Sequence, residues 1–539
     1  MNAIQRSLAV LRSRRLSLFS VIITTVGFFP FSSNAAGTLR TVALTGQPAP
    51  GTTLNFLAMA VGPVVINDAG QTAFGAVLSA NGGDRGIWSE GSGTLALVAR
   101  TDMPAPGPPN NLEFFLTGVP SLNNAGQTAF WSLVGFSRES LWLEELGGLE
   151  PVALAGTAAP GTSPAVNFRT VSPFFSFNDA GQAAFTALLS GTGVTAANIN
   201  SMWSNGGGSL AMLARTGSQA PGTPSGVNFD NFGTVQLNSA GQSAFFATLA
   251  GAGVTDDNNR GIWSNRTGSI ALVVRGGSQA HGLPAGVSYT NVFNGGFNSA
   301  GQIALVASLA GAGVHSENNH GVWLERSGDF VLVARKGEQA PGTPSGVNYG
   351  SFQSTALNDA GRLAFAAGLV GDGVDSTNDS GLWVESSTGL NLVARGGSQA
   401  PGTASGVTFG EFGNLAFNDA GQVALTVTLA GIGVGDSNDQ GIFATDRTGA
   451  PHLIARTGDL LEVAAGDSRV VSHLQFAGGS GGGDGRRIGL NRAGQVAFRA
   501  VFADGSSGAF VSNLVAVPEP TALGLAALSS FAFLWRRRR

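Results

Sequence analysis

A five-residue pattern of the form Asn-x-Ala-Gly-Gln recurs along this chain and constrains its fold more than any other feature. Eight copies begin at Asn67, Asn123, Asn178, Asn238, Asn298, Asn358, Asn418 and Asn491, and Arg362 is the single replacement of the final Gln. Successive copies lie 56, 55, 60, 60, 60, 60 and 73 residues apart. A period of this length indicates an array of repeated supersecondary units.

Each unit contains four short strand candidates, which the fourth unit illustrates. Its pattern predicts strands over residues 229–237, 242–249, 261–264 and 269–275. The second of these alternates and is rich in Phe, as a half-buried strand requires. Asn238 to Gly241 supplies a tight turn between the first two strands. Repeated units of four antiparallel strands are typical of a β-propeller, so we expect an all-β fold.

The two ends of the array predict a closed ring. In the last unit we expect strands over residues 488–490, 495–502 and 508–512, with no fourth strand after them. Residues 39–44 and the following Gly-Gln-Pro-Ala-Pro-Gly segment match the fourth strand and loop of the other units, as at residues 215–222. We therefore predict a single closed propeller of eight blades, completed by the N-terminal strand. An open solenoid needs capping units, which the sequence does not contain, and two smaller propellers are the other alternative.

Residues 1–35 read as a signal peptide that precedes the predicted propeller of residues 36–516. Arg6, Arg12, Arg14 and Arg15 form a basic region, residues 16–31 are mostly apolar, and residues 33–35 supply small side chains for cleavage. An uncleaved N-terminal anchor is the alternative. Either interpretation predicts an exported chain.

Residues 517–539 form a tail in three parts. Pro518, Glu519 and Pro520 precede an apolar stretch over residues 522–535, and Arg536 to Arg539 end the chain. A helix of that apolar length spans about 21 Å, less than the ~30 Å hydrocarbon core of a bilayer. The segment is thus suited to transient membrane insertion.

The tail resembles the PEP-CTERM sorting signal of Gram-negative bacteria that make exopolysaccharide. The resemblance implies that Pro518, Glu519 and Pro520 are recognised by an exosortase, a membrane transpeptidase-like enzyme. It also implies export to the cell envelope, the outer surface or the extracellular matrix. A plain C-terminal membrane anchor is the alternative.

The repeats also resemble an uncharacterised tandem-repeat family of exported bacterial proteins. The matching residues are the turn at residues 418–422 and the Leu-Val-Ala-Arg strand with its Gly-Ser-Gln-Ala-Pro-Gly loop at residues 392–402. This resemblance implies no known activity.

Charge and cysteine content exclude several classes of function. Without residues 1–35 and 518–539, 21 basic and 32 acidic residues remain, a net charge of −11. Nucleic acid and anionic lipid require clustered cations, so neither is an expected partner. The chain has no Cys, which excludes disulfides, thiolate metal sites and a Cys nucleophile.

Motifs of catalysis are also missing. None of the five His residues belongs to an H-E-x-x-H pair, and no His follows the G-x-S-x-G match at residues 478–482. An aromatic residue recurs in the third strand of every unit, which favours packing between blades over a sugar-stacking platform. We predict no catalytic residue and no cofactor apart from possible Ca²⁺.

Loops between the second and third strands of units four to seven are rich in carboxylates and amides. Carboxylate and amide oxygens ahead of a Gly are ligands suited to Ca²⁺, so we predict weak binding there. The alternative is that Asp and Asn cap their own turns. The candidate ligands are Asp256, Asp257, Asn258, Glu317, Asn318, Asp375, Asn378, Asp379, Asp436, Asn438 and Asp439.

Six fourth strands end in Arg: Arg100, Arg215, Arg275, Arg335, Arg395 and Arg456. We expect each to pair with a carboxylate near the adjacent third strand, although recognition of an acidic polysaccharide is an alternative.

Two classes of function fit these observations. The first is a non-enzymatic surface or matrix protein, for which an extracellular polysaccharide is a candidate partner. The second is a carbohydrate-active enzyme, a hydrolase or lyase, on a propeller scaffold. The enzyme interpretation needs polar or titratable residues in one blade where other blades carry packing residues, and fold alone supplies no activity.

Overall fold

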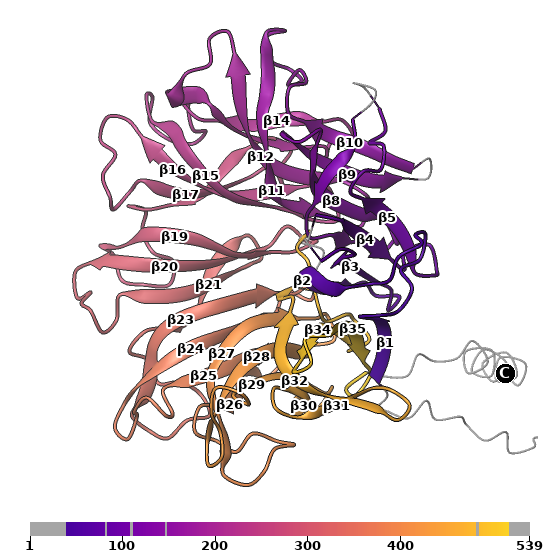
Figure 1. Ribbon diagram of the computed structural model, residues 1–539. Coiled ribbons are helices and arrows are strands. Elements are labelled where there is room, and N and C mark those ends of the chain that lie inside the picture. The colour runs from indigo at the N-terminus through magenta and orange to yellow at the C-terminus, as the bar shows by residue number, and fades with distance from the viewer. Residues whose placement is uncertain (1–38, 81–82, 108–111, 146–147, 481–484, 517–539) are drawn as a thin grey trace, which may run out of the picture.

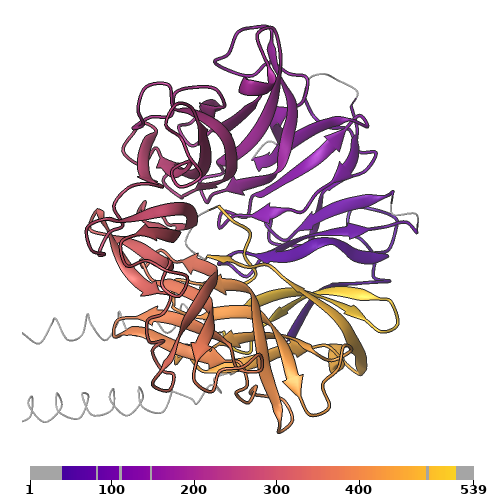
Figure 2. The same cartoon turned by 90° about the vertical axis from the view of Figure 1, so that its left-hand side faces the viewer.

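The strands of this protein form a ring of antiparallel sheets around a central axis (Figures 1 and 2). The computed structural model describes residues 39–516, except 81–82, 108–111, 146–147 and 481–484. Within these residues there are eight sheets of four or five strands. The predicted eight-bladed propeller is confirmed.

The first four blades follow one another along the chain. Blade 1 contains β2 (Ala58–Ile66), β3 (Thr72–Val77), β4 (Arg85–Ser89) and β5 (Ala96–Arg100). Blade 2 contains β6 (Phe114–Thr117), β7 (Ser121–Leu122), β8 (Thr128–Val134), β9 (Arg138–Glu145) and β10 (Gly148–Leu154). Blade 3 contains β11 (Val166–Phe177), β12 (Ala183–Gly191), the 3₁₀ helix η1 (Ala196–Asn198), β13 (Asn200–Ser204) and β14 (Ala211–Arg215). Blade 4 contains β15 (Asn228–Leu237), β16 (Ser243–Ala250), β17 (Arg260–Ser264) and β18 (Ala271–Arg275), within two residues of the predicted strands.

The remaining blades complete the ring. Blade 5 contains β19 (Val287–Phe297), β20 (Ile303–Gly311), β21 (His320–Arg326) and β22 (Asp329–Arg335). Blade 6 contains β23 (Val347–Leu357), β24 (Leu363–Gly371), β25 (Ser380–Ser386) and β26 (Gly389–Arg395). Blade 7 contains β27 (Val407–Phe417), β28 (Val423–Gly431), β29 (Gln440–Thr445), β30 (Pro451–Arg456) and β33 (Gly479–Ser480). Blade 8 contains β31 (Leu460–Ala464), β32 (Asp467–Phe476), β34 (Val496–Phe502), β35 (Ser507–Ser512) and the N-terminal β1 (Leu39–Leu44).

The N-terminal strand completes blade 8, as predicted. β1 pairs antiparallel with β35, with Leu39 opposite Ser512 and Leu44 opposite Gly508. The Thr41 hydroxyl donates a hydrogen bond of 2.6 Å to the carbonyl of Val463 in β31. The two ends of the array thus share one sheet, which leaves neither end of the ring open.

The first strand of the last blade is not the one predicted. We expected residues 488–490 in that role, but β32 takes it and pairs with β34. The Gly-rich segment of residues 477–490 separates β32 from its Asn491 turn, which explains the spacing of 73 residues. In blades 3 to 7 the first strand ends directly at the Asn turn, so the residues next to Asn491 were a misleading guide to the position of this strand.

This insertion crosses the middle of the ring, where Figure 2 shows a yellow segment entering from the last blade. The carbonyls of Gly485 and Ile488 accept hydrogen bonds of 2.8 and 3.0 Å from the amides of Phe177 in blade 3 and Ile66 in blade 1. Arg487 donates to the carbonyls of Val119 and Pro120 in blade 2, at 2.8 and 3.0 Å. Burial lowers the pKa of Arg487 to about 10. Contacts with blades 1, 2 and 3 make the insertion a second closure of the ring.

The recurring Asn residues form a closed circle of hydrogen bonds around the axis. Each Asn side chain donates Nδ2 to the carbonyl of the Asn that begins the next turn, at 2.7–3.1 Å, and Asn491 returns to Asn67. Each Asn Oδ1 accepts the amide of the fifth residue of its own turn. All eight are at most 3% exposed. Only Asn places a donor and an acceptor in this geometry, which explains the first position of the repeat. We call this side of the ring the Asn-turn face.

The third-strand aromatics pack in the core, as predicted. Trp263 is fully buried and meets Phe229 of its own blade edge-on, with ring centroids 5.0 Å apart, next to Ala184 and Met202 of blade 3. Its indole donates a hydrogen bond of 3.0 Å to the carbonyl of Pro221 in the loop from the preceding blade. The Ala-Pro-Gly loop therefore serves to anchor one blade on the next.

Candidate functional site

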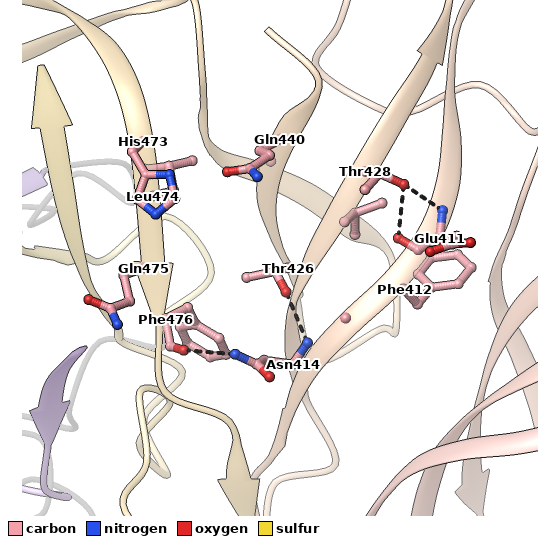
Figure 3. Close-up of a pocket in the computed structure, with 13 residues that line it drawn as sticks. Glu411, Phe412, Asn414, Thr426, Thr428, Gln440, His473, Leu474, Gln475 and Phe476 are labelled. Carbon is pink, nitrogen blue, oxygen red and sulfur yellow. Dashed lines mark hydrogen bonds between the residues drawn. The ribbon is translucent and has the colours of Figure 1, made fainter. Parts of the chain in front are cut away.

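The strongest candidate site is a hollow of about 280 Å³ between blades 7 and 8. In Figure 3, β32 with His473 and Gln475 stands on one side of this hollow, and β27 with Glu411 and Asn414 on the other. The lining residues are Glu411, Phe412, Gly413, Asn414, Thr426, Val427, Thr428, Gln440, Gly441, His473, Leu474, Gln475 and Phe476. Amides, hydroxyls, one carboxylate and one imidazole thus surround one small volume.

A bulge in β27 brings part of this lining to the surface. The pairing of β27 with β28 shifts between Phe412 and Leu415, and Gly413 and Asn414 between them are exposed. The amide of Asn414 donates to Thr426 Oγ1 at 2.9 Å, and that of Glu411 donates to Thr428 Oγ1 at 2.7 Å. The two threonine hydroxyls therefore replace ladder bonds that the bulge removes.

Three polar side chains at the hollow keep their hydrogen-bonding capacity for a ligand. Within the part of the chain that the structure describes, no hydrogen bond joins the Glu411 carboxylate, the Gln440 amide or the His473 ring to another residue. Gln475, in contrast, accepts a hydrogen bond of 3.0 Å from Arg499. Exposed groups of this kind bind water until a ligand replaces it.

The equivalent space between blades 4 and 5 is filled. Phe246 in blade 4 is the counterpart of Thr426 in blade 7. Each of the two residues pairs with the residue that directly precedes the aromatic residue of the third strand. Its ring stacks on Phe293 of blade 5 with centroids 5.6 Å apart, and the Arg260 guanidinium lies 5.8 and 5.1 Å from the two rings. A small hydroxyl side chain in place of Phe leaves the hollow between blades 7 and 8.

A second hollow of about 250 Å³ lies between blades 6 and 7. Here Ala366 stands in the position of Phe246, and Gly368 takes the place of Thr248. Gly350, Ser351, Gln353, Gly368, Leu369, Val370, Asp379, Ser380 and Glu411 line this hollow. Glu411 lines both hollows, so the two are neighbours on the inner side of the ring.

The predicted Ca²⁺ loops are closed by their own asparagines. Oδ1 of Asn258, Asn318, Asn378 and Asn438 accepts a backbone amide three residues earlier, at 2.8–3.2 Å. Nδ2 of the same four residues donates to a Gly carbonyl five residues earlier, at 2.9–3.1 Å. Asn198 makes the same two bonds in blade 3, although its loop has no carboxylate. The amide in these loops therefore has a structural role that does not require a metal.

The loop carboxylates are partly occupied as well. Hydrogen bonds from Thr377 lower the pKa of Asp375, and hydrogen bonds from Ser316 and His315 lower that of Glu317. Asp256, Asp257, Asp379, Asp436 and Asp439 are the other carboxylates among the candidate ligands. Among residues 39–516, gaps aside, no three His, Asp or Glu side chains gather as a metal site. Weak Ca²⁺ binding through carboxylate and amide oxygens stays a prediction.

The prediction for the strand-end arginines is correct only for Arg100, which binds Asp84 at 2.7 and 2.8 Å. Five others donate Nε to the main-chain carbonyl of a loop Asn, at 2.6–3.1 Å; the pairs are Arg215–Asn198, Arg275–Asn258, Arg335–Asn318, Arg395–Asn378 and Arg456–Asn438. The reason is geometric, because the closed Asn loop presents a carbonyl where blade 1 presents a carboxylate. These arginines secure the loops.

Sequence reasoning missed the two hollows and their residues. Glu411 and Asn414 lie in β27 and His473 lies in β32, and nothing in the linear sequence places the two strands together. The sequence indicates the hollows only when the repeat units are aligned with one another. In that alignment Thr426 and Ala366 occupy the position of Phe246 in blade 4. The sorting motif of Pro518, Glu519 and Pro520 and the signal peptide lie outside the described residues.

Comparison with protein families gives two matches. The model of a family of unknown function, DUF7453, matches residues 24–137 and 82–523. The PEP-CTERM protein-sorting motif matches residues 516–539 and marks the chain as an exported protein of the cell envelope that an exosortase-type enzyme processes. No curated protein matches the chain in sequence.

Solved structures similar to this chain include a hydrolase, a β-propeller domain and a gluconolactonase. Puromycin hydrolase is 13% identical with a TM-score of 0.39, and the match covers 86% of this chain but only 61% of the hydrolase. The β-propeller domain of the Trilobed protease from Pyrococcus furiosus is 8% identical with a TM-score of 0.38, covering 74% of this chain and 98% of the domain. The periplasmic gluconolactonase of Pseudomonas aeruginosa is 16% identical with a TM-score of 0.27, covering 70% and 93%. Similarity at this level supports no conclusion about activity.

Proposed function

Because the chain belongs to the DUF7453 family and ends in a PEP-CTERM motif, we propose that it is a non-enzymatic binding protein of the bacterial surface or matrix. Its ligand is an extracellular saccharide held in the two hollows beside Glu411. In this proposal residues 1–35 are a signal peptide, residues 36–516 the propeller, and residues 517–539 a tail that inserts transiently in the membrane of a Gram-negative cell.

The lining of the hollows carries this proposal. Sugar hydroxyls both donate and accept hydrogen bonds, and Asn414, Gln440 and Gln353 offer amides that do the same. The volume of about 280 Å³ lies just below the ~300–1,000 Å³ of typical small-molecule sites, which suits one sugar unit. Two neighbouring hollows suit two units of one chain.

The charge of the site favours a neutral or weakly charged saccharide. Glu411 and Asp379 are the acidic residues of the lining, and His473 is the only residue there that can become cationic. A polyanionic chain would meet uncompensated carboxylates. Neutral sugars are therefore the first ligands to test.

A polysaccharide hydrolase or lyase is the second candidate. Glu411 and Asp379 line the same hollow between blades 6 and 7, and glycoside hydrolysis generally uses two carboxylates. This alternative predicts that products accumulate during incubation with a bound polysaccharide. The non-enzymatic proposal predicts binding without new reducing ends or unsaturated products.

One pair of variants tests the site. Thr426→Phe introduces into blade 7 the aromatic ring that fills the interface in blade 4. In blade 4 the ring of Phe246 packs over Gly233, and in blade 7 Gly413 faces Thr426 in the same way. We expect this variant to fold and to lose the glycans that the native protein binds on an array and in calorimetry. Thr186→Phe at the same strand position of blade 3 is the control and should keep that binding. Equal binding by both variants would place the ligand elsewhere.

Ca²⁺ is proposed as a weak ligand of the loops in blades 4 to 7. Calorimetry should give an affinity of about millimolar, as in other extracellular modules, and Asp375→Ala with Asp379→Ala should weaken it further. Sub-micromolar binding, or binding unchanged in the double variant, would contradict this proposal.

A further inference from the structure

Both ends of the described chain emerge on the Asn-turn face. Leu39, the first residue of β1, lies opposite Ser512 at the end of β35, and Ser512 also pairs with Val496. Val496 directly follows the turn of Asn491 to Gln495. Figure 1 shows β1 and β35 side by side at the edge of the ring.

The last described residues are fixed to that face. Gln495 Nε2 donates a hydrogen bond of 2.7 Å to Asn513 Oδ1, and Gln422 Nε2 donates to the Val515 carbonyl at 3.1 Å. Val515 is only 4% exposed. The sorting tail therefore begins from a fixed point of the ring, Val515, three residues before Pro518.

The hollows lie toward the other face. Gln440 and Ser380 begin their third strands, and third strands begin at the end opposite the Asn turns. The Asp and Asn loops directly precede these two residues. The propeller thus has a face that carries the tail and a face that carries the hollows.

We infer that, while the tail is inserted in the membrane, the Asn-turn face lies against the lipid surface and the hollows open away from it. Five residues, 517–521, separate Ala516 from the apolar stretch, and they span at most about 18 Å. A ring of eight blades on so short a tether has no room to turn over. Within the described residues no helix is long and apolar enough to cross a bilayer, so insertion depends on the tail.

The second residues of the Asn turns do not favour contact with anionic lipid. The second residues of the Asn turns include Asp68, Asp179, Asp359 and Asp419 against a single Arg492. Arg492 already lies 3.3 Å from the Asp419 carboxylate. Anionic headgroups are attracted by clustered Lys and Arg, which this set lacks. The orientation that we infer follows from the tether, whether or not the hollows bind a saccharide.

Single-cysteine labelling tests the orientation, because the native chain has no Cys. Ser92→Cys places a thiol in the exposed turn between β4 and β5 on the Asn-turn face, and Ser437→Cys places one in an exposed loop of the other face. Each full-length variant is inserted into phosphatidylcholine vesicles and treated with a polyethylene glycol maleimide. The reaction in detergent solution gives the intrinsic rate of each thiol.

We expect the vesicles to slow labelling of Ser92→Cys by about tenfold relative to detergent, because the short tether holds that face at the lipid. Labelling of Ser437→Cys should keep its detergent rate, and proteolytic removal of the tail should restore the rate of Ser92→Cys. Equal rates for the two variants on vesicles, or slower labelling of Ser437→Cys, would overturn the inference.

Discussion

The interface between blades 4 and 5 and the interface between blades 7 and 8 are built from the same repeat but end differently. In the first, Phe246, Phe293 and Arg260 fill the space between neighbouring sheets. In the second, Thr426 and the exposed bulge at Asn414 leave a hollow of about 280 Å³. At these two interfaces the side chain at one strand position differs, and the aromatic ring fills a space that the threonine leaves open.

Toward the Asn-turn face the same two interfaces are alike. Asn238 donates to the Asn298 carbonyl at 3.1 Å, and Asn418 donates to the Asn491 carbonyl at 2.8 Å. The circle of hydrogen bonds is thus continuous past the insertion that precedes Asn491. The comparison teaches that the repeat maintains the ring at one face and leaves the inner wall free to vary.

The largest effect is expected from a variant in which the ring cannot close. Deleting residues 39–46 removes β1, leaves β35 as an unpaired edge and breaks the bond from Thr41 to β31. Since every blade depends on closure, we expect a sharp fall in melting temperature, measured by circular dichroism. Deleting the tail from Pro518 is the control and should leave the melting temperature unchanged. A stable protein without β1 would show that the insertion of residues 477–490 closes the ring by itself.

The circle of asparagines predicts equal losses at the filled and the open interface. Asn238→Ala and Asn418→Ala each remove a buried donor and acceptor. The amide of Gln242 or Gln422 then has no acceptor, and the carbonyl of the next Asn loses one of its two hydrogen bonds. Each should lower the free energy of unfolding by about 1–3 kcal/mol. Urea denaturation of both variants measures the two losses side by side. A much smaller loss for Asn418→Ala would mean that the circle is weaker beside the insertion.

A cavity in the filled interface is expected to have a smaller effect. Phe246→Thr copies into blade 4 the residue of blade 7 and removes the stacking on Phe293 and the contact with Arg260. Because Phe246 is only partly buried, we expect a loss of about 1–2 kcal/mol, below that of a fully buried Phe. The variant should not gain saccharide binding, since Asn414 and His473 have no counterpart there. Urea denaturation and the glycan array measure the two outcomes.

The fold could be predicted because its information is periodic. The Asn turn, the alternating second strand and the third-strand aromatic recur in units of nearly constant length, and each has a local physical cause. The unpaired last unit then identified Leu39 to Leu44 as its partner. The strand prediction was wrong where the repeat is interrupted, at the insertion that precedes Asn491.

The candidate site could not be predicted for a different reason. Glu411 and His473 are joined by the packing of two blades, and side chains that meet across blades leave no spacing rule in the sequence. The Asp and Asn loops drew attention because their composition is conspicuous. Their asparagines prove to close the loops and to present carbonyls to Arg275 and its equivalents. Composition alone did not distinguish a ligand from a turn.

The smallest predicted effect concerns the turn between β29 and β30, on the Asn-turn side of the open interface. Burial opposes ionisation of Asp446, but hydrogen bonds from Thr448, His452 and the amide of Ala450 prevail and lower its pKa to about 2. The ionised carboxylate therefore stabilises the folded state above the ordinary Asp pKa near 3.8, and this stabilisation is lost as the pH falls from about 4 to about 2. Asp68 and Asp419 act in the opposite sense, because burial raises their pKa and favours the protonated form. We expect Asp446→Asn to melt lower than the native protein at pH 6 and to converge with it near pH 2. A difference in melting temperature that stays constant over this range would mean that the carboxylate charge does not contribute.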